Sequence, residues 1–221
     1  MKSTVDGSYI IIEGIDGAGK TSQMTFIENY FKKIGRQAYL TREPSAGLIG
    51  VFIRNELLSG KHTVGSNTIQ TLFTADRMEH VKSMTSVVES GVDVISDRGY
   101  LSGIAYQPTD EEAQFSLGLH RLCMRGFKPT FTIFLDLEPE VAIERLNARL
   151  MGPGNSYMDC HKKHEIFENE ERLIMARDRY HRTMDLLGKE GEVFHVIDAS
   201  GSMEHVSYLI KEILDLHHGI L

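Results

Sequence analysis

The sequence predicts an α/β fold, in which a five-stranded parallel sheet carries helices on both faces and a small lid. Apolar runs of strand length alternate with longer stretches in which apolar residues recur at helical spacing. A glycine-rich turn joins the first apolar run to the first helical stretch. Strands and helices that alternate in this way form a parallel sheet whose ligands bind at the carboxyl ends of the strands. We therefore expect the functional site at that edge of the sheet.

Three strands and three helices are expected in the first half of the chain. The strands are residues 9–12, 37–41 and 92–96, which are rich in apolar and β-branched side chains. The second and third helices are predicted at about residues 49–58 and 66–90. The first helix follows the glycine-rich turn, and its apolar stripe consists of Met24, Ile27, Phe31 and Ile34.

The second half supplies two more strands, at residues 130–137 and 192–197. Pro139 fits the first turn of a helix that runs to about Leu150, and the following segment 151–159 is expected to be a loop because it contains Gly152, Pro153 and Gly154. We predict a lid at about residues 149–160, within one domain that spans 1–221. Two further helices are expected, with buried faces formed by Phe167, Leu173, Ile174, Tyr180 and Met184 and, after Ser202, by Val206, Leu209, Ile210 and Ile213.

Composition limits the partners that the chain can have. The net charge of −7 disfavours nucleic acid, so an anionic ligand must be small and held by a local group of positive charges. Only two cysteines are present, Cys123 and Cys160, and they form no paired motif, which is typical of a reduced compartment. We found neither a signal peptide nor an apolar run of membrane-spanning length, and we expect a cytoplasmic protein without a membrane partner.

Residues 13–21 read E-G-I-D-G-A-G-K-T and have the spacing of a P-loop between a strand and a helix. In such a loop, backbone N–H groups converge on phosphate oxygens at the helix N-terminus, the lysine bridges the β- and γ-phosphates, and the threonine hydroxyl ligates Mg²⁺. We therefore predict a P-loop NTPase fold that binds ATP. The N-K-x-D guanine signature of GTPases is absent from the sequence. The predicted ATP-binding residues are Gly14, Ile15, Asp16, Gly17, Ala18, Gly19, Lys20 and Thr21.

A second group of residues points to an acceptor site. The third strand ends in Asp97, placed for a Mg²⁺-bound water, and is followed by Arg98, placed for a second phosphate. On the preceding helix, Phe73 and Arg77 lie four residues apart and share a face. An aromatic ring beside a guanidinium suits a nucleobase, although either Phe73 or Arg98 taken singly could instead be a core residue or a salt-bridged arginine.

These motifs together resemble the thymidylate kinase family. The P-loop with its leading Glu13, T-R-E-P at 41–44, L-F-T-A-D-R at 72–77, D-R at 97–98, S-G-I-A-Y-Q at 102–107 and K-P-T-F-T-I-F-L-D at 128–136 occur in the family's order. The resemblance spans nearly the whole chain and implies a nucleoside monophosphate kinase fold. It implies ATP-dependent phosphorylation of dTMP to dTDP, with Mg²⁺, in a homodimer.

The resemblance also implies roles for individual residues. Asp16 would meet the sugar 3′-OH and the Mg²⁺ shell, and Arg98 would hold the acceptor phosphate. Phe73 would stack on thymine, Arg77 would contact a thymine carbonyl, and Tyr106 would crowd a ribose 2′-OH. The other implied acceptor-site residues are Glu43, Ser102 and Gln107, and the implied metal-site residues are Thr21 and Asp97.

Family members carry a catalytic arginine either in the P-loop, after the aspartate, or in the lid. Gly17 follows Asp16 here, so the chain is similar to the lid type. Arg145 and Arg149 precede the lid, and Arg149, nearest the loop, is the candidate for reaching the transferred phosphate. The expected catalytic set is Lys20, Asp16, Arg98 and Arg149, acting by direct in-line transfer. Tyr157 and Asp159 are candidates for closing over the sugar.

The chain departs from the family pattern at two places. Gly99 stands where the family has an aromatic residue or histidine, and Ser45 and Ala46 follow T-R-E-P where it has two glycines. These departures leave open a broader deoxynucleoside monophosphate kinase. A non-catalytic P-loop protein that senses ATP is an alternative of a different class. Cys160, His161 and His164 have spacings compatible with a metal, but no second pair completes a set, and a solvated helix start is expected.

Overall fold

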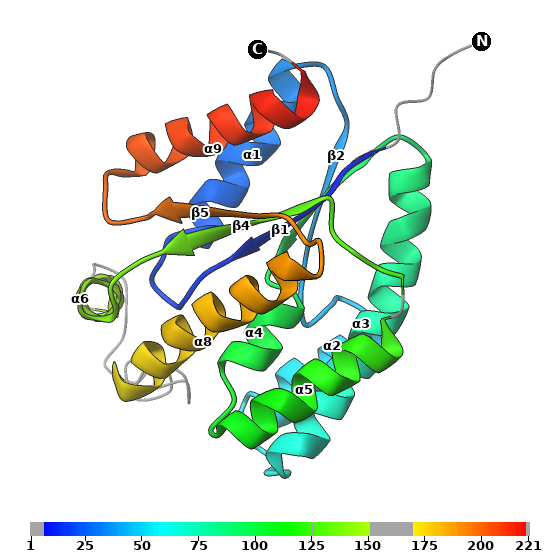
Figure 1. Cartoon of the computed structure of the whole chain (residues 1–221), viewed down its shortest axis with the longest axis vertical. Helices are drawn as coiled ribbons and strands as arrows, with labels where there is room; N and C mark the ends of the chain where they lie inside the picture. Colours follow the sequence, from blue (N-terminus) through cyan, green and yellow to red (C-terminus); the bar gives the residue numbers. More distant parts are fainter. Residues whose placement is uncertain (1–6, 125, 151–169, 220–221) are drawn as a thin grey trace.

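A computed structural model of the chain describes residues 7–124, 126–150 and 170–219 (Figure 1). Its centre is a five-stranded sheet in which all neighbouring strands are parallel, as predicted, with the order β2-β3-β1-β4-β5. The strands are β1 (Tyr9–Glu13), β2 (Ala38–Arg42), β3 (Asp93–Asp97), β4 (Phe131–Asp136) and β5 (Phe194–Asp198). Each lies within two residues of its predicted bounds.

Helices cover both faces of the sheet (Figure 1). One face carries α1 (Lys20–Lys33) and α9 (Met203–His218). The other carries α3 (Ser66–Glu89), α4 (Tyr100–Ala105), α5 (Asp110–Cys123) and α8 (Glu170–Lys189). Helix α6 (Pro139–Leu150) follows β4 and begins at the predicted proline. Within the described ranges, no helix combines the length and the apolar character needed to span a membrane.

The core lies between the sheet and these helices. The side chains of β1 are buried along its whole length, as expected for a central strand of a parallel sheet covered on both faces. On α1, three residues of the predicted stripe, Met24, Ile27 and Phe31, are buried, and Ile34 packs against the core from the helix end. β1 lies between β3 and β4, where the strand order reverses. The loop after β1 therefore lies at the topological switch point of the sheet, where ligands of such folds bind.

The helical stretch predicted near 49–58 is present as a short α-helix, α2 (Leu48–Phe52), followed directly by a π-helical turn, η1 (Ile53–Leu57). The burial predicted for some helix residues was wrong. Ile174 was placed on the buried side of α8, but its side chain is 47% exposed, because Leu173 and Ala176 turn to the sheet instead. On α9, Val206 and Ile210 are buried, whereas Leu209 and Ile213 are only partly so.

Helices α4 and α5 were not predicted. A local signal for α5 exists in the capping box at its start, where Thr109 Oγ1 accepts from the Glu112 N–H at 3.2 Å and a Glu112 carboxylate oxygen accepts from the Thr109 N–H at 3.1 Å. Of the predicted lid, residues 149 and 150 end helix α6. The rest of the lid, together with Tyr157, Asp159, Cys160, His161, His164 and Phe167, lies outside the described residues.

Candidate functional site

The P-loop connects β1 to α1 and forms the start of the helix. Gly19 is the N-cap residue of α1 and adopts a φ of 93°, a left-handed conformation that glycine takes without strain. The loop is closed by the Ala18 N–H, which donates to the Ile15 carbonyl at 3.2 Å. The first N–H groups of an α-helix have no acceptor four residues earlier within the helix, so this end of α1 can hold an anion.

Gly17 is packed against the backbone of helix α6. Its φ is 87°, and a Cβ atom at this position would lie 2.7 Å from the carbonyl oxygen of Ala142 and 3.1 Å from its Cα. Cβ atoms essentially never lie within 3.0 Å of another heavy atom, and the opposing atoms belong to a helix backbone that cannot move aside cheaply. The turn therefore requires glycine for two reasons, its conformation and its close approach to α6.

The side chain of Lys20 is buried against the backbone of the P-loop. Its Nζ donates to the carbonyl oxygens of Gly14 at 2.9 Å and Ile15 at 3.0 Å. Burial, followed by the Arg98 charge, lowers the pKa of Lys20 to about 8, and the Asp16 carboxylate acts in the opposite direction. Neutral carbonyl oxygens thus hold the Lys20 ammonium group, and anionic phosphate oxygens, which are stronger acceptors, can replace them.

Thr21 and Asp97 are the two predicted metal-site residues. Thr21 is exposed in the first turn of α1, and Asp97 is the last residue of β3, where it pairs with Ile12 in the sheet register. Asp97 Oδ1 is buried and has no hydrogen-bond partner among the described residues. A buried carboxylate oxygen without a donor suits a hydrated cation. Within the described ranges, no group of three or more histidine, cysteine, aspartate or glutamate side chains could hold a metal by itself.

Arg98, Asp16 and Tyr106 form one polar group beside the P-loop. An Arg98 guanidinium nitrogen is hydrogen-bonded to Asp16 Oδ1 in an ion pair, and its Cζ lies 5.4 Å from the centre of the Tyr106 ring. The Tyr106 hydroxyl accepts from the Asp16 N–H at 3.0 Å and donates to Asp16 Oδ2 at 3.3 Å. Burial alone would raise the pKa of Asp16, but the positive charges of Arg98 and Lys20 lower it below its ordinary value. Asp16 is therefore a carboxylate at neutral pH.

The backbone of Arg98 is held in an unusual conformation. Its φ is 69°, in the left-handed region that few residues other than glycine adopt, and the Ser96 hydroxyl donates to its carbonyl at 2.8 Å. The Arg98 side chain is also held by α4, because Arg98 Nη1 donates to Ser102 Oγ at 2.9 Å. The turn after β3 thus directs the guanidinium toward the P-loop.

Glu13, the first residue of the P-loop motif, is completely buried behind Arg98. Its Oε1 accepts from the N–H groups of Gly99 at 2.8 Å and Ser102 at 3.2 Å, and so caps helix α4 from another element. Its Oε2 accepts from the hydroxyls of Ser102 at 2.7 Å and Tyr180 at 2.9 Å. Burial raises the pKa of Glu13, although the Arg98 charge and these hydrogen bonds act in the opposite direction.

A cleft of about 390 Å³ opens beside this polar group. Its apolar wall comes from η1, the start of α3 and the segment between them, and its polar wall from β3–α4 and the P-loop. All eight predicted acceptor-site residues line it: Asp16, Glu43, Phe73, Arg77, Arg98, Ser102, Tyr106 and Gln107. Phe73 is half-buried there, so it presents part of its ring to the cleft.

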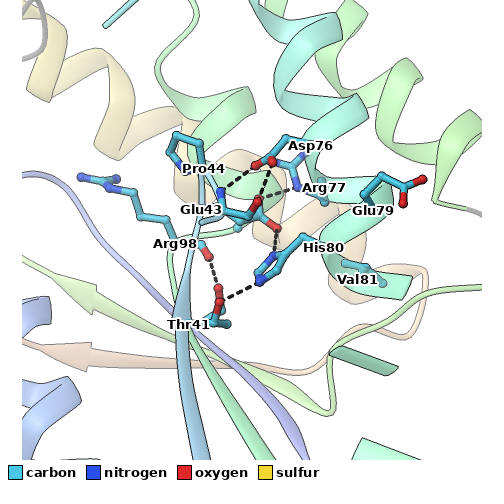
Figure 2. Close-up of polar contacts among 12 residues, drawn as sticks. Thr41, Glu43, Pro44, Asp76, Arg77, Glu79, His80, Val81 and Arg98 are labelled. Atoms are coloured by element: carbon cyan, nitrogen blue, oxygen red, sulfur yellow. Dashed lines mark hydrogen bonds and ion pairs between the residues drawn. The ribbon is translucent and has the colours of Figure 1, made fainter. Parts of the chain in front are cut away.

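Figure 2 shows how the end of this cleft is built around Glu43. Arg77 Nε donates to Glu43 Oε2 at 2.6 Å, and His80 Nδ1 lies 3.6 Å from Glu43 Oε1. The Thr41 hydroxyl and His80 Nε2 are 2.7 Å apart, which ties the end of β2 to α3. Burial would raise the pKa of Glu43, but the Arg77 charge and then His80 hold it below its ordinary value, so the buried pair is ionic.

The other two predicted catalytic residues, Lys20 and Arg149, do not line the cleft. Lys20 belongs, with Thr21, to the P-loop side of the site, and Arg149 is exposed near the end of α6. Arg145, on the same helix, donates to the Ser200 carbonyl at 3.2 Å. The structure therefore separates a cleft beside the P-loop from a set of groups at the P-loop itself, with Arg98 and Asp16 between them.

Several cleft residues were missed in the sequence. Gln70, which lines the cleft, lies on the same face of α3 as Phe73 and Arg77, so helical spacing from the predicted pair would have found it. His80, three residues beyond Arg77, contacts Glu43 rather than the cleft, and the same spacing would have found it. Arg172, half-buried at the start of α8, also lines the cleft. No local signal marks Arg172, because it reaches the site only through the packing of α8 against α4.

The structure also shows the setting of the two departures from the family pattern. The N–H and Oγ of Ser45 both donate to the Asp76 carboxylate, each at 2.6 Å, so the serine anchors its loop to α3. A Cβ atom on Gly99 would lie 3.0 Å from Ile11 Cδ1 and 3.7 Å from Glu13 Oε1, on the side of β1. A side chain at position 99 would therefore begin toward the core, against β1.

Known proteins provide an independent comparison. The family model described as thymidylate kinase matches residues 12–210 of the chain. A thymidylate kinase of Desulfosudis oleivorans is 33% identical over 203 residues, which cover 90% of this chain and 92% of that protein. The thymidylate kinase of Rhodopirellula baltica is 33% identical, covering 94% and 80% of the two chains, and that of Francisella tularensis subsp. tularensis is 30% identical, covering 96% and 98%.

Proposed function

The chain belongs to the thymidylate kinase family, and from that premise we propose that it transfers the γ-phosphoryl group of ATP to dTMP, giving dTDP and ADP for dTTP synthesis. The observation that carries this proposal is the cleft beside the P-loop, which brings all eight predicted acceptor residues together. A P-loop protein that only senses ATP has no need of a second site for a phosphate and a base.

The acceptor is proposed to lie along this cleft. Its phosphate would face Arg98, next to the P-loop, and its base would lie between Phe73 and the far wall, with Arg77 donating to a carbonyl of the base. Gln107 Oε1 is a buried acceptor without a hydrogen-bond partner among the described residues, so it can receive an N–H of the base. Tyr106, fixed by both of its contacts with Asp16, would occupy the space of a ribose 2′-OH.

Mg²⁺ is proposed to be held between the nucleotide phosphates, the Thr21 hydroxyl and, through water, Asp97. The residues fit this role because Asp97 Oδ1 is a buried acceptor that lacks a donor and Thr21 stands exposed at the phosphate-binding helix end. The bound ion would supply charge neutralisation at the β- and γ-phosphate oxygens.

In the proposed reaction, an oxygen of the acceptor phosphate attacks the γ-phosphorus of ATP and the bond to the β–γ bridging oxygen breaks. The electron pair of that bond stays on ADP, and no covalent enzyme intermediate forms. Lys20 would leave its two loop carbonyls for the β- and γ-phosphates, and Arg98 would turn part of its fork from Asp16 to the acceptor phosphate. Arg149 is the proposed lid-side arginine that neutralises the transferred group.

The experiment that tests this function is a comparison of acceptors. Steady-state ADP release is measured with ATP and Mg²⁺ and with dTMP, dUMP, dCMP, dGMP and UMP in turn. A kcat/KM for dTMP at least tenfold above the others is expected. Comparable rates for several acceptors would make this a broader-specificity deoxynucleoside monophosphate kinase, and ATP binding without binding of any acceptor would favour the sensor.

We also propose that the chain works as a homodimer in the cytoplasm. The dimer is supported by large apolar side chains that stand exposed on α2 and α3, namely Leu48, Val51, Phe52 and Met78. Sedimentation of the wild-type protein and of Leu48→Lys tests the dimer, since a dimer through this face would dissociate in the variant. We propose the cytoplasm because the substrates of the enzyme are nucleotides of intracellular metabolism.

A further inference from the structure

The segment Ser102–Gln107 carries three of the acceptor-site residues, and little within it holds it in place. It begins in α4, a helix of only six residues, and continues into the turn before α5. A helix this short is not stable by itself, so its position must come from contacts with other elements. Figure 1 shows α4 alongside α8, and the two helices pack together.

The end of the segment is bound by Arg179 of α8. Its side chain is buried, and its Nη1 donates to the carbonyl oxygen of Ala105 at 3.0 Å and also to that of Gln107. The Ala105 carbonyl ends the last turn of α4 and the Gln107 carbonyl lies just beyond it, where helix geometry supplies no internal partners. Nε and Nη2 of the same guanidinium donate to Asp110 Oδ1 at 3.3 and 3.0 Å, at the start of α5. The planar fork of one arginine thus fixes the backbone on both sides of Tyr106.

The beginning of the segment is bound by the next residue, Tyr180. Its hydroxyl donates to Glu13 Oε2 at 2.9 Å and lies 2.7 Å from Ser102 Oγ. Ser102 Oγ in turn accepts from Arg98 Nη1 at 2.9 Å. Tyr180 is fully buried and packs on Phe134 with ring centres 4.9 Å apart, so its hydroxyl has little freedom to move.

From these contacts we propose that Arg179 and Tyr180 are positioning residues for the acceptor, which grip the segment Ser102–Gln107 at its two ends. The proposal rests on the function proposed above. Arg179 sets the place of Tyr106 and Gln107, and hence the fit of the sugar and base. Tyr180 sets the place of Ser102, and through it the Arg98 guanidinium that faces the phosphate. Neither residue is among those that line the cleft, and their effect arises because small displacements of positioned groups are costly to catalysis.

Each residue has a matched control on the same chain. Arg182 also donates to Asp110, at 3.3 and 3.4 Å, but it is half-exposed and, among the contacts of the described residues, makes none with the carbonyls of the segment. Arg179→Lys and Arg182→Lys therefore both keep a positive charge near Asp110, and only the first removes the fork from the segment. Tyr208→Phe, on the exposed face of α9, is the control for Tyr180→Phe.

KM for dTMP, KM for ATP and kcat are measured for wild type and the four variants, together with the kcat/KM ratio of dTMP to ribothymidine 5′-monophosphate. Arg179→Lys is expected to raise KM for dTMP at least tenfold, to leave KM for ATP within twofold and to lower the deoxyribose preference at least fivefold. Tyr180→Phe is expected to lower kcat at least fivefold. Both control variants should stay within twofold of wild type in every parameter.

Melting temperatures are measured in parallel, because they distinguish a positioning role from a purely structural one. Variants of Arg179 and Tyr180 that melt lower but keep wild-type KM, kcat and sugar preference would overturn the proposal, as would an equal effect of Arg182→Lys. Should Arg179→Lys fail to fold, Tyr180→Phe decides alone, because it removes one oxygen and keeps the ring. All variants are assayed with the monophosphate that the wild type turns over fastest. If that acceptor is not dTMP, the proposed function is contradicted. The ratio of variant KM to wild-type KM for that acceptor still tests the positioning role.

Discussion

Arg77 Nε lies 2.6 Å from Glu43 Oε2, and both side chains are less than a tenth exposed. The pair joins the loop after β2 to the middle of α3 and forms one end of the cleft. Glu43 takes the Nε donor of Arg77, so the remaining guanidinium nitrogens are available to the cleft. A buried charge pair of this kind holds a fork in one orientation, provided that both charges stay in place.

Removal of the negative partner should therefore affect both stability and acceptor binding. Glu43→Gln leaves the Arg77 charge buried without a counter-ion, and we expect the free energy of unfolding to fall by about 3 kcal/mol and KM for dTMP to rise roughly tenfold. Urea denaturation and acceptor titration measure the two effects. Glu28→Gln, which breaks the exposed Glu28–Lys32 pair, is the control and should change stability by less than about 1 kcal/mol. Equal effects of the two substitutions would contradict this account.

Asp97→Asn should change the response to Mg²⁺ more than the response to dTMP. The substitution removes the charge of a buried acceptor that has no donor among the described residues. We expect the Mg²⁺ concentration for half-maximal activity to rise at least tenfold, while KM for dTMP stays within threefold. Activity is titrated with Mg²⁺ at saturating ATP. Asp198→Asn, at the exposed end of β5, serves as the control, and an unchanged Mg²⁺ titration in Asp97→Asn would remove Asp97 from the metal site.

Arg149→Ala should reduce turnover without weakening acceptor binding. If Arg149 meets charge that develops on the transferred phosphoryl group, its loss should lower kcat on the order of 100-fold, with KM for dTMP nearly unchanged. Arg145→Ala, one helical turn earlier on α6, should affect kcat less than threefold. A kcat for Arg149→Ala within a factor of two of wild type would show that this role is wrong.

His120 should make the protein less stable as the pH falls. Its ring is buried and stacks on Tyr100 at 3.9 Å, and burial, followed by the Arg77 charge, lowers its pKa to about 4. Above pH ~6.5 the imidazole is neutral in both states, whereas between pH ~6.5 and 4 only the unfolded chain binds the proton. The free energy of unfolding should fall through this window by up to roughly 3 kcal/mol and level off below it.

The measurement is urea denaturation of wild type and His120→Phe at pH 7, 6 and 5. Relative to its own value at pH 7, the wild type should lose about 2 kcal/mol more than the variant by pH 5. Parallel pH profiles for the two proteins would mean that His120 titrates in the folded state as it does in the unfolded chain.

The parts of the site that depend on short sequence patterns could be predicted. The P-loop lies between a strand and a helix and was found by its spacing, and Phe73 and Arg77 were paired because helical geometry places residues four apart on one face. The central strands β1, β3 and β4 were found because buried parallel strands are apolar runs, whereas the edge strands β2 and β5 are largely half-buried or exposed. The family resemblance then supplied Tyr106 and Gln107, which carry no local pattern of their own.

The parts that depend on tertiary packing could not be predicted. Arg172 and Arg179 are ordinary arginines of a charged helix in the sequence, and only the contact of α8 with α4 brings one to the cleft and the other to the carbonyls of Ala105 and Gln107. Ile174 was misplaced because the apolar side of α8 is narrower than its sequence pattern, so one residue of the expected stripe faces outward. The setting of Ser45 also depends on a partner, Asp76, that is 31 residues away.

The close approach of Gly17 to Ala142 limits which side chains position 17 can accept. An arginine at position 17, like any residue with a Cβ atom, would meet the Ala142 carbonyl oxygen at 2.7 Å, and α6 would have to shift to admit it. Replacing Gly17 by arginine alone would therefore disturb the packing of α6 on the P-loop in addition to adding a charge there.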